Sequence, residues 1–150
     1  MKRFSALLCA LALCLLCACG TQTDQPYSPS LTSTLLEADV FSEPLEPLDQ
    51  EIACLLYQLD GEQFNLTDLQ AHRSAGATYE EVAVLTFQTE ADASAALSTM
   101  KVYVAARLAD CRSYMPDQAP KLEHAILDQR ANSILLVVAA DWTAAAELAK

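Results

Sequence analysis

The chain has 150 residues, of which 53% are hydrophobic, and its formal net charge is −11. This length suits one compact domain, and the apolar content is too high for a wholly disordered chain. A nucleic-acid-binding protein needs clustered Lys and Arg to neutralise phosphates, whereas this chain has nine basic and 20 acidic residues. Three glycines are too few for a dinucleotide or P-loop phosphate cradle. We therefore expect no nucleic-acid partner and no cofactor.

The chain begins with MKRFSALLCALALCLLCACG, in which two basic residues precede an apolar run at 4–16. This run is shorter than the roughly 20 residues that span a bilayer as a mature helix, which favours a secretory signal. Its end, LCACG at 16–20, resembles the lipobox of bacterial lipoproteins. That resemblance implies a signal peptide at 1–18, cleavage after Ala18 and a diacylglycerol on the sulfur of Cys19, so that the membrane is a partner. An ordinary cleaved signal or an uncleaved anchor is the alternative.

Residues 19–43 are predicted to be the lipidated cysteine and a flexible polar tether, because Ser, Thr, Gln and Pro are prominent there and apolar periodicity is weak. A single domain is expected over 44–150. Loss of the signal leaves seven basic and 20 acidic residues. That charge disfavours binding to anionic lipid head groups and to nucleic acid and is compatible with a cationic partner, although an acidic extracytoplasmic surface is usually only a solvated one.

Two cysteines, Cys54 and Cys111, remain once the signal is removed and Cys19 is acylated. In an exported protein they permit one disulfide. Cys111 falls on an apolar helical stripe, which favours packing as a buried thiol over a bridge. The sequence has no CxxC motif and no Cys/His cluster, so we expect no metal site.

The first half of the domain is predicted to hold two helices and a strand. A first helix begins near Pro47 and ends at Gly61, with an amphipathic stripe formed by Leu48, Ile52, Leu55 and Leu59. A short helix follows from Thr67, its N-cap, to Arg73. The strand at 81–88 is apolar on both faces, which predicts an inner strand of a covered sheet.

A long helix dominates the second half of the domain. Thr89 and Asp92 form a capping-box-like start. The apolar residues behind them recur every three or four positions and predict one continuous core-facing stripe: Ala93, Leu97, Met100, Val104, Leu108, Cys111 and Met115. One more helical turn is expected at 121–124, after two prolines.

The C-terminal part is predicted to be a hairpin and a helix. Strands at 125–129 and 134–140 flank a turn at 130–133, and Asp141 caps a helix over 142–148. The whole pattern predicts an α+β fold, in which a small, mainly antiparallel sheet of about three strands packs on one side against one long helix and two or three shorter helices. A parallel pairing across the long helix is the alternative.

Several short strings resemble a family of bacterial lipoproteins known only as domain of unknown function 4358. They are Leu-Tyr at 56–57, GATYEEVAV at 76–84, Tyr-Met-Pro at 114–116 and Lys-Leu-Glu at 121–123. The resemblance covers nearly all of 44–149, with Asn132 where the family commonly has a turn glycine. It implies a fold and an extracytoplasmic location, and it names no reaction.

The sequence offers few catalytic constellations. Glu80 and Glu81 are adjacent, so on a strand they point to opposite faces and cannot share a proton. His124 and Asp128 would form a metal or acid–base pair only if 121–128 were helical, which the strand predicted from 125 contradicts. No GxSxG nucleophile elbow occurs.

Two classes of function follow from these patterns. The first is a non-enzymatic binding or interaction module, held on the extracytoplasmic face of the cell membrane, whose partner is an unidentified envelope protein or ligand. Its candidate surface consists of aromatic residues: Tyr57, Tyr79, Tyr114 and Trp142. The alternative is an extracytoplasmic enzyme acting on cell-envelope material, with His72 or His124 as the group that titrates near neutrality.

Overall fold

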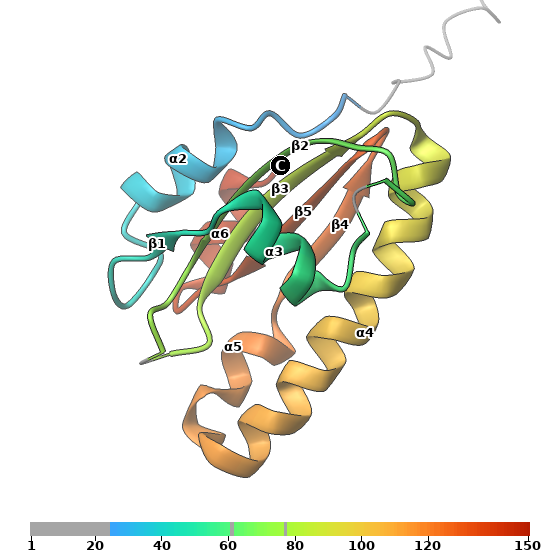
Figure 1. Ribbon diagram of the computed structural model, residues 1–150. Coiled ribbons are helices and arrows are strands. Elements are labelled where there is room, and N and C mark those ends of the chain that lie inside the picture. Colours follow the sequence, from blue (N-terminus) through green and yellow to red (C-terminus); the bar gives the residue numbers. More distant parts are fainter. Residues whose placement is uncertain (1–24, 61, 77) are drawn as a thin grey trace, which may run out of the picture.

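A five-stranded antiparallel sheet forms the centre of the computed structural model, which describes residues 25–60, 62–76 and 78–150 (Figure 1). The predicted signal peptide and Cys19 lie outside the described residues. The strands are β1 (Glu46–Pro47), β2 (Leu66–Arg73), β3 (Glu81–Phe87), β4 (Ile126–Arg130) and β5 (Ser133–Val138), in the spatial order β1-β2-β3-β5-β4. The α+β class is confirmed. The expected number of about three strands is wrong, because β1 and β2 extend one side of the sheet.

Strands β3 and β5 are the inner strands. All residues of β5 and all but Thr86 of β3 are buried, and the two strands pair in antiparallel register from Glu81↔Val138 to Thr86↔Ser133. Their runs of β-branched and apolar residues suit a strand that is covered on both faces. The prediction of an inner strand at 81–88 is therefore confirmed. All pairings among the described strands are antiparallel, so the parallel alternative is not realised.

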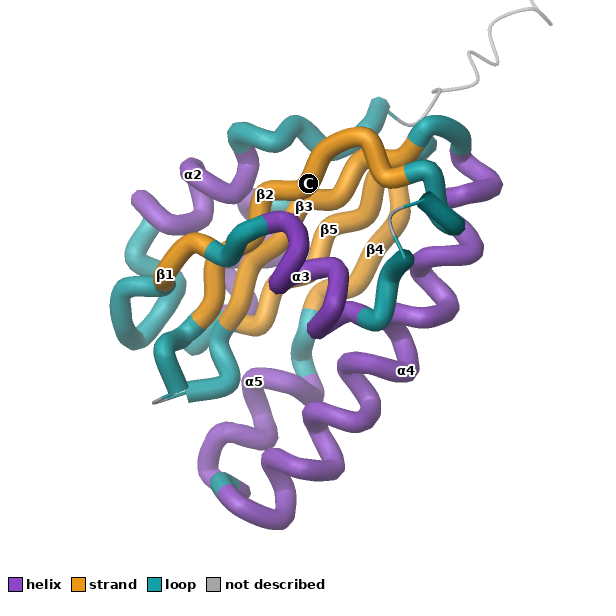
Figure 2. Tube along the Cα trace, viewed as in Figure 1, coloured by secondary structure: helices purple, strands orange, loops and turns teal. Residues whose placement is uncertain are grey.

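Helices cover both faces of the sheet (Figure 2). One face, with Ala83 and Leu85, packs against α3 (Gln50–Tyr57), α4 (Glu90–Tyr114) and α5 (Ala119–Glu123). The other face, with Val82 and Val84, packs against α2 (Leu31–Glu37) and α6 (Trp142–Leu148). The expectation of helices on one side only is wrong, because two inner strands that are apolar on both faces need cover on both.

Residues 25–43 belong to the folded unit. Leu35 of α2 is fully buried, and Tyr27 and Val40 are 6% and 2% exposed in the core of the second face. The prediction of a flexible tether is therefore wrong for this segment. Its apolar residues are too widely spaced to show a period, yet they pack in one cluster with Val82 and Val84 of β3 and with Leu135 and Val137 of β5.

Strand β2 occupies the segment that the sequence predicts as a short helix from Thr67. Leu69 and Ala71 point into the core, whereas Asp68 is half-buried and Gln70 is exposed, which is the two-residue period of a strand. Thr67 caps no helix, and its hydroxyl donates to the carbonyl oxygen of Thr86 on β3 at 3.0 Å. Pairing with β3 along its whole length overrides the local helix propensity.

Helix α3 buries a different face from the predicted one. Ala53 and Tyr57 are fully buried, whereas Ile52 and Leu55 of the predicted stripe are 47% and 75% exposed. The small Ala53 allows close approach to the sheet. The helix ends at Tyr57, because Gln58 takes a left-handed conformation with φ of 57°.

The elements after residue 88 follow the predictions closely. The Thr89 hydroxyl accepts from the Asp92 amide at the start of α4, and the Asp141 carboxylate accepts from the Ala144 amide at the start of α6. The predicted stripe of α4 faces the core, with three residues buried and the others partly buried; Ala96 and Tyr103 are buried in addition. A short 3₁₀ helix, Pro116–Gln118, precedes α5.

Within the described ranges, no helix combines the length and the apolar character that crossing a membrane requires.

We expect Leu35→Ala to lower the free energy of unfolding by about 2 to 5 kcal/mol, the cost of a buried cavity of this kind. The matched control is Leu55→Ala, whose side chain is 75% exposed and whose loss should change stability by about 0.5 kcal/mol or less. Urea unfolding of both variants measures the difference. Equal stabilities would contradict the packing of residues 25–43 onto the sheet.

Candidate functional site

Two adjacent carboxylates open strand β3, and both are fully buried. Glu80 and Glu81 have 0% exposed surface. Their side chains lie on opposite faces of the sheet, as strand geometry predicts, and each has its own set of partners. Because an unpaired buried carboxylate is costly, each set of partners identifies a polar cluster that the fold maintains.

Glu80 is held by Ser42 and Lys121. The Ser42 amide donates to both carboxylate oxygens at 3.0 and 3.1 Å, and its hydroxyl donates to one of them at 2.8 Å. The Lys121 ammonium lies 3.0 Å from the carboxylate and 3.1 Å from the Ser42 hydroxyl oxygen. Lys121 neutralises the buried charge of Glu80. The cluster therefore holds two elements at the start of β3: the segment that follows α2, through Ser42, and helix α5, through Lys121.

A second carboxylate, that of Glu43, extends this cluster. The Ser74 hydroxyl hydrogen-bonds to Glu43, and the Thr78 hydroxyl lies within 3.1 Å of Glu43 and 3.3 Å of Glu80. Ser74 also accepts from the Thr78 amide at 2.9 Å. The cluster therefore fixes the 41–43 segment against the connection between β2 and β3.

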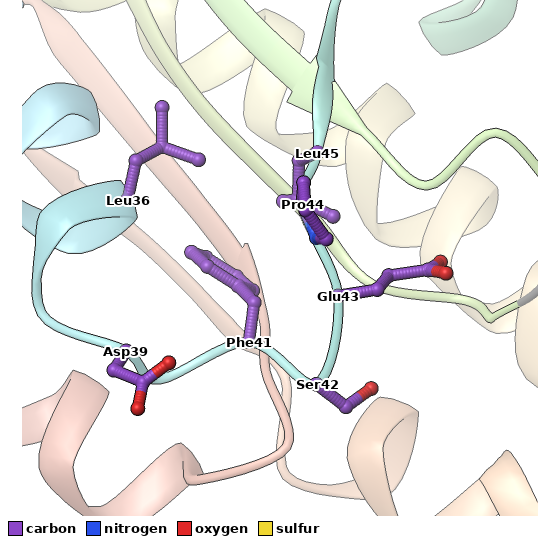
Figure 3. A pocket seen from close by; sticks show the side chains of 7 residues that line it. All are labelled: Leu36, Asp39, Phe41, Ser42, Glu43, Pro44 and Leu45. Carbon is purple, nitrogen blue, oxygen red and sulfur yellow. The ribbon is translucent and has the colours of Figure 1, made fainter.

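A hollow of about 300 Å³ lies between α2 and the segment that follows it (Figure 3). The side chains of Leu36 and Phe41 face each other across it, whereas the Glu43 carboxylate points away from both. Its lining consists of Leu36, Asp39, Phe41, Ser42, Glu43, Pro44 and Leu45. A second hollow, of about 330 Å³, is lined by residues 46–48 and 73–76. Apolar walls with a few polar groups are typical of small-molecule sites.

Glu81 lies on the opposite face among aromatic residues. The Tyr103 hydroxyl donates to it, with O–O distances of 2.8 and 3.1 Å, and the Arg107 Nε lies 3.8 Å from one oxygen. The Tyr57 ring meets the Tyr103 ring edge to face, with centroids 5.1 Å apart. Burial raises the pKa of Glu81, and the Tyr103 hydrogen bond and the charge of Arg73 partly oppose this shift. Burial and the Glu81 charge raise the pKa values of Tyr57 and Tyr103.

The aromatic residues proposed as a surface have different environments. Tyr57 is fully buried, so its assignment to an interaction surface is wrong; a Leu-Tyr pair near a helix end does not reveal which side chain faces the sheet. Tyr79 is half-buried, with the Arg107 guanidinium 4.8 Å from its ring centroid. Tyr114 is 80% exposed. Trp142 is half-buried and stacks on His124, with centroids 4.5 Å apart and an interplanar angle of 8°.

The two histidines stand in separate settings. His72 is a half-buried residue of β2, and burial lowers its pKa, which favours the neutral ring. His124 follows α5 and stacks on Trp142, and strand β4 places Asp128 outside any shared helix with it. No histidine is among the residues lining the two described hollows. Within 25–60, 62–76 and 78–150, no group of three His, Cys, Asp or Glu residues could hold a metal ion.

Both cysteines of the described chain are free thiols. Cys111 is fully buried on α4, which agrees with the packing interpretation, and Cys54 is half-buried on α3. Burial raises the pKa of both thiols, so neither is an activated nucleophile.

The buried cluster at Glu80 was missed by the sequence reasoning. The available signal was a pair of acidic residues at the start of a strand that is otherwise apolar on both faces. Lys121, Ser42 and Glu43 come from segments about 40 residues away on either side, so their convergence depends on the tertiary fold.

Comparison with family models, curated proteins and solved structures finds no match for this chain. The resemblance to domain of unknown function 4358 therefore gains no support from these comparisons and stays a prediction.

Because the folded-state pKa of Glu81 is raised, the native protein binds a proton more readily than the unfolded chain above the ordinary value of 4.5. We expect the free energy of unfolding to fall as pH rises from 4.5 through the raised pKa, and Glu81→Gln to remove this component. Chemical denaturation from pH 4 to 8 measures it. The control is Glu51→Gln, on the exposed side of α3, which should keep the same dependence of the free energy of unfolding on pH. If Glu81→Gln also left this dependence unchanged, Glu81 would not be its cause.

Proposed function

We propose that this protein is a lipid-anchored, extracytoplasmic binding module of the bacterial cell membrane. The anchor rests on the LCACG string at 16–20, which follows a basic start and a short apolar run. The binding function rests on one observation, the hollow between α2 and 41–45, where Leu36 and Phe41 face each other (Figure 3). Two acyl chains on Cys19 would be enough for stable attachment.

The lining of this hollow favours a ligand that carries an apolar group and no negative charge. Four apolar side chains line it: Leu36, Phe41, Pro44 and Leu45. The surrounding segment 37–51 contains six acidic residues and no basic one. These acidic residues repel an anionic ligand, whereas they do not repel a neutral ligand and attract a cationic one. The ligand is therefore a small amphiphile, or a partner segment, with an apolar and a neutral or basic part.

A binding role accounts for the polar clusters better than catalysis does. The carboxylates of Glu80 and Glu81 have no exposed surface and are occupied by hydrogen bonds and ion pairs within the protein. A general acid or base needs access to the proton that it transfers. The Glu80 cluster instead holds the 41–43 segment in place, which keeps one wall of the hollow rigid.

The anchor is tested by expressing the full chain in a bacterial host and determining the mature N-terminus by mass spectrometry. We expect the protein in the membrane fraction, starting at Cys19 and carrying the mass of a diacylglycerol. Cys19→Ser should lose that mass. Cys17→Ser is the matched control and should keep it, because Leu16 precedes Cys17 and a small residue is needed before the cut. A soluble wild type, or cleavage elsewhere, would contradict the anchor.

The hollow is tested by titrating the protein with three probes that share one apolar chain: octylammonium, octanol and octanoate. We expect NMR shifts at the hollow in that order of affinity. Leu36→Ala should weaken all three by roughly tenfold, or about 1.4 kcal/mol. Asp39→Asn should narrow the difference in affinity between octylammonium and octanol, because it removes a negative charge from the lining of the hollow. The substitution keeps the backbone conformation, since Asn tolerates the φ of 57° found at this position.

The control for this titration is Leu97→Ala, which truncates a half-buried leucine on the other face of the sheet. It should leave all three affinities unchanged. Binding that Leu36→Ala and Leu97→Ala weaken equally, or tightest binding by octanoate, would count against the proposed site.

A further inference from the structure

Tyr27 fixes the point at which the chain joins the domain. Its amide donates to the Ser133 hydroxyl oxygen at 2.7 Å, and its own hydroxyl donates to Asp128. The Arg130 guanidinium lies 4.4 Å from its ring centroid, and the residue is only 6% exposed. Three separate contacts therefore hold Tyr27 against the β4–β5 hairpin.

The hairpin turn lies at the same end of the molecule as the start of α4. The Gln129 side chain donates to the Glu90 carbonyl oxygen at 3.2 Å, and the Asn132 side chain donates to that of Phe87 at 2.6 Å. We call this end, with Tyr27, residues 128–133 and the start of α4, the clasp end. Figure 1 shows the chain entering here, opposite α5.

The opposite end of the molecule, which we call the far end, carries the candidate site. Strand β3 begins there, with the Glu80 cluster and its connection to Ser42. Helix α4 also ends there, at the exposed Tyr114. With 25 residues, α4 is about 37 Å long and runs from the clasp end to Tyr114, beyond the start of β3 (Figure 1). The seven residues of β3 span about 23 Å.

The chain between Cys19 and Tyr27 is shorter than this distance. Eight residue steps separate the two positions in the sequence, and at full extension they reach about 28 Å at most. If the molecule stood upright on the Tyr114 end of α4, the clasp end would be about 37 Å from the membrane, beyond the reach of the anchor. The acylated chain therefore permits the clasp end to face the lipid and prevents the reverse orientation.

From this geometry we infer that the clasp end faces the lipid surface and that Tyr27 sets this orientation, presenting Tyr114 and the two hollows away from the membrane. The inference rests on the proposed lipid anchor. Of the large exposed apolar side chains of the described chain, Leu148, which is 39% exposed, lies beside the clasp end, since Arg130 donates to the carbonyl oxygens of Ala149 and Lys150. The others, Ile52, Leu55, Val102 and Tyr114, do not lie within residues 86–92 or 128–133. The clasp end is thus a mainly polar surface with one exposed leucine at its border.

The orientation is tested with the acylated full chain in phosphatidylcholine nanodiscs that carry a rhodamine head-group label. Ala91→Cys and Ser113→Cys place a donor fluorophore near the two ends of α4, at exposed positions about 33 Å apart along the helix. Both are made in a Cys54→Ser background, since Cys111 is fully buried. We expect energy transfer to be several-fold more efficient from position 91 than from position 113.

Tyr27→Ala tests the role of the clasp. The variant removes the hydroxyl contact with Asp128 and the ring contact with Arg130, and leaves only the backbone amide to hold residue 27. Once that single contact opens, the next fixed residues are those of α2, starting at Leu31, so the spacer grows to 12 steps and to about 42 Å, longer than α4. The difference in energy-transfer efficiency between positions 91 and 113 should therefore become smaller. Tyr27→Phe keeps the ring and its contact with Arg130, and should preserve most of the difference in energy transfer.

The outcomes separate this inference from the function on which it rests. A chain that lacks the diacylglycerol and does not enter the nanodiscs contradicts the anchor, and the orientation with it. A chain that is acylated and inserted, but transfers energy equally from both positions or better from 113, overturns the orientation alone. A difference that Tyr27→Ala leaves unchanged overturns the role of Tyr27.

Discussion

The burial of strand β3 on both faces is the constraint on which the rest of the structure depends. The strand lies between β2 and β5, and its side chains alternate between two separate cores. Apolar surface of this extent has to be removed from water on each side. Helices α3, α4 and α5 cover one side. On the other side, α6 and the segment 25–43 complete the cover, which explains why a polar stretch near the N-terminus is part of the fold.

The two carboxylates at the start of β3 give this strand its register. On one face of the sheet, the Glu80 carboxylate accepts a hydrogen bond from Ser42 and forms an ion pair with Lys121. On the other face, the Glu81 carboxylate accepts a hydrogen bond from Tyr103. A slip of one residue would move each carboxylate to the opposite face, away from its partners. An unpaired buried charge costs several kcal/mol, so alternative pairings of β3 are strongly disfavoured. The same contacts connect the strand to α4, α5 and the 41–43 segment.

This arrangement separates the attachment point from the candidate site. The proposed anchor lies only a short stretch of chain before Tyr27, which is held at the clasp end. The Glu80 cluster and the hollow beside Phe41 belong to the far end, and the cluster lies about 23 Å away, the length of the seven-residue strand β3. In the proposed orientation a short spacer thus serves a purpose that a long one cannot, because it keeps the site directed away from the membrane.

The sequence alone determined the elements that local interactions specify: the apolar strands 81–88 and 134–140, the stripe and cap of α4, and the Asp141 cap of α6. It also carries the basic start, the apolar run and the LCACG string on which the proposed anchor rests. Only the tertiary structure decided that 66–73 is a strand, that α3 buries Ala53 and Tyr57, and that 25–43 folds onto the sheet. It alone brought Ser42, Glu80 and Lys121 together. The physical reason is that periodicity and capping act over a few residues, whereas these features depend on contacts between segments tens of residues apart, whose burial outweighs local propensity.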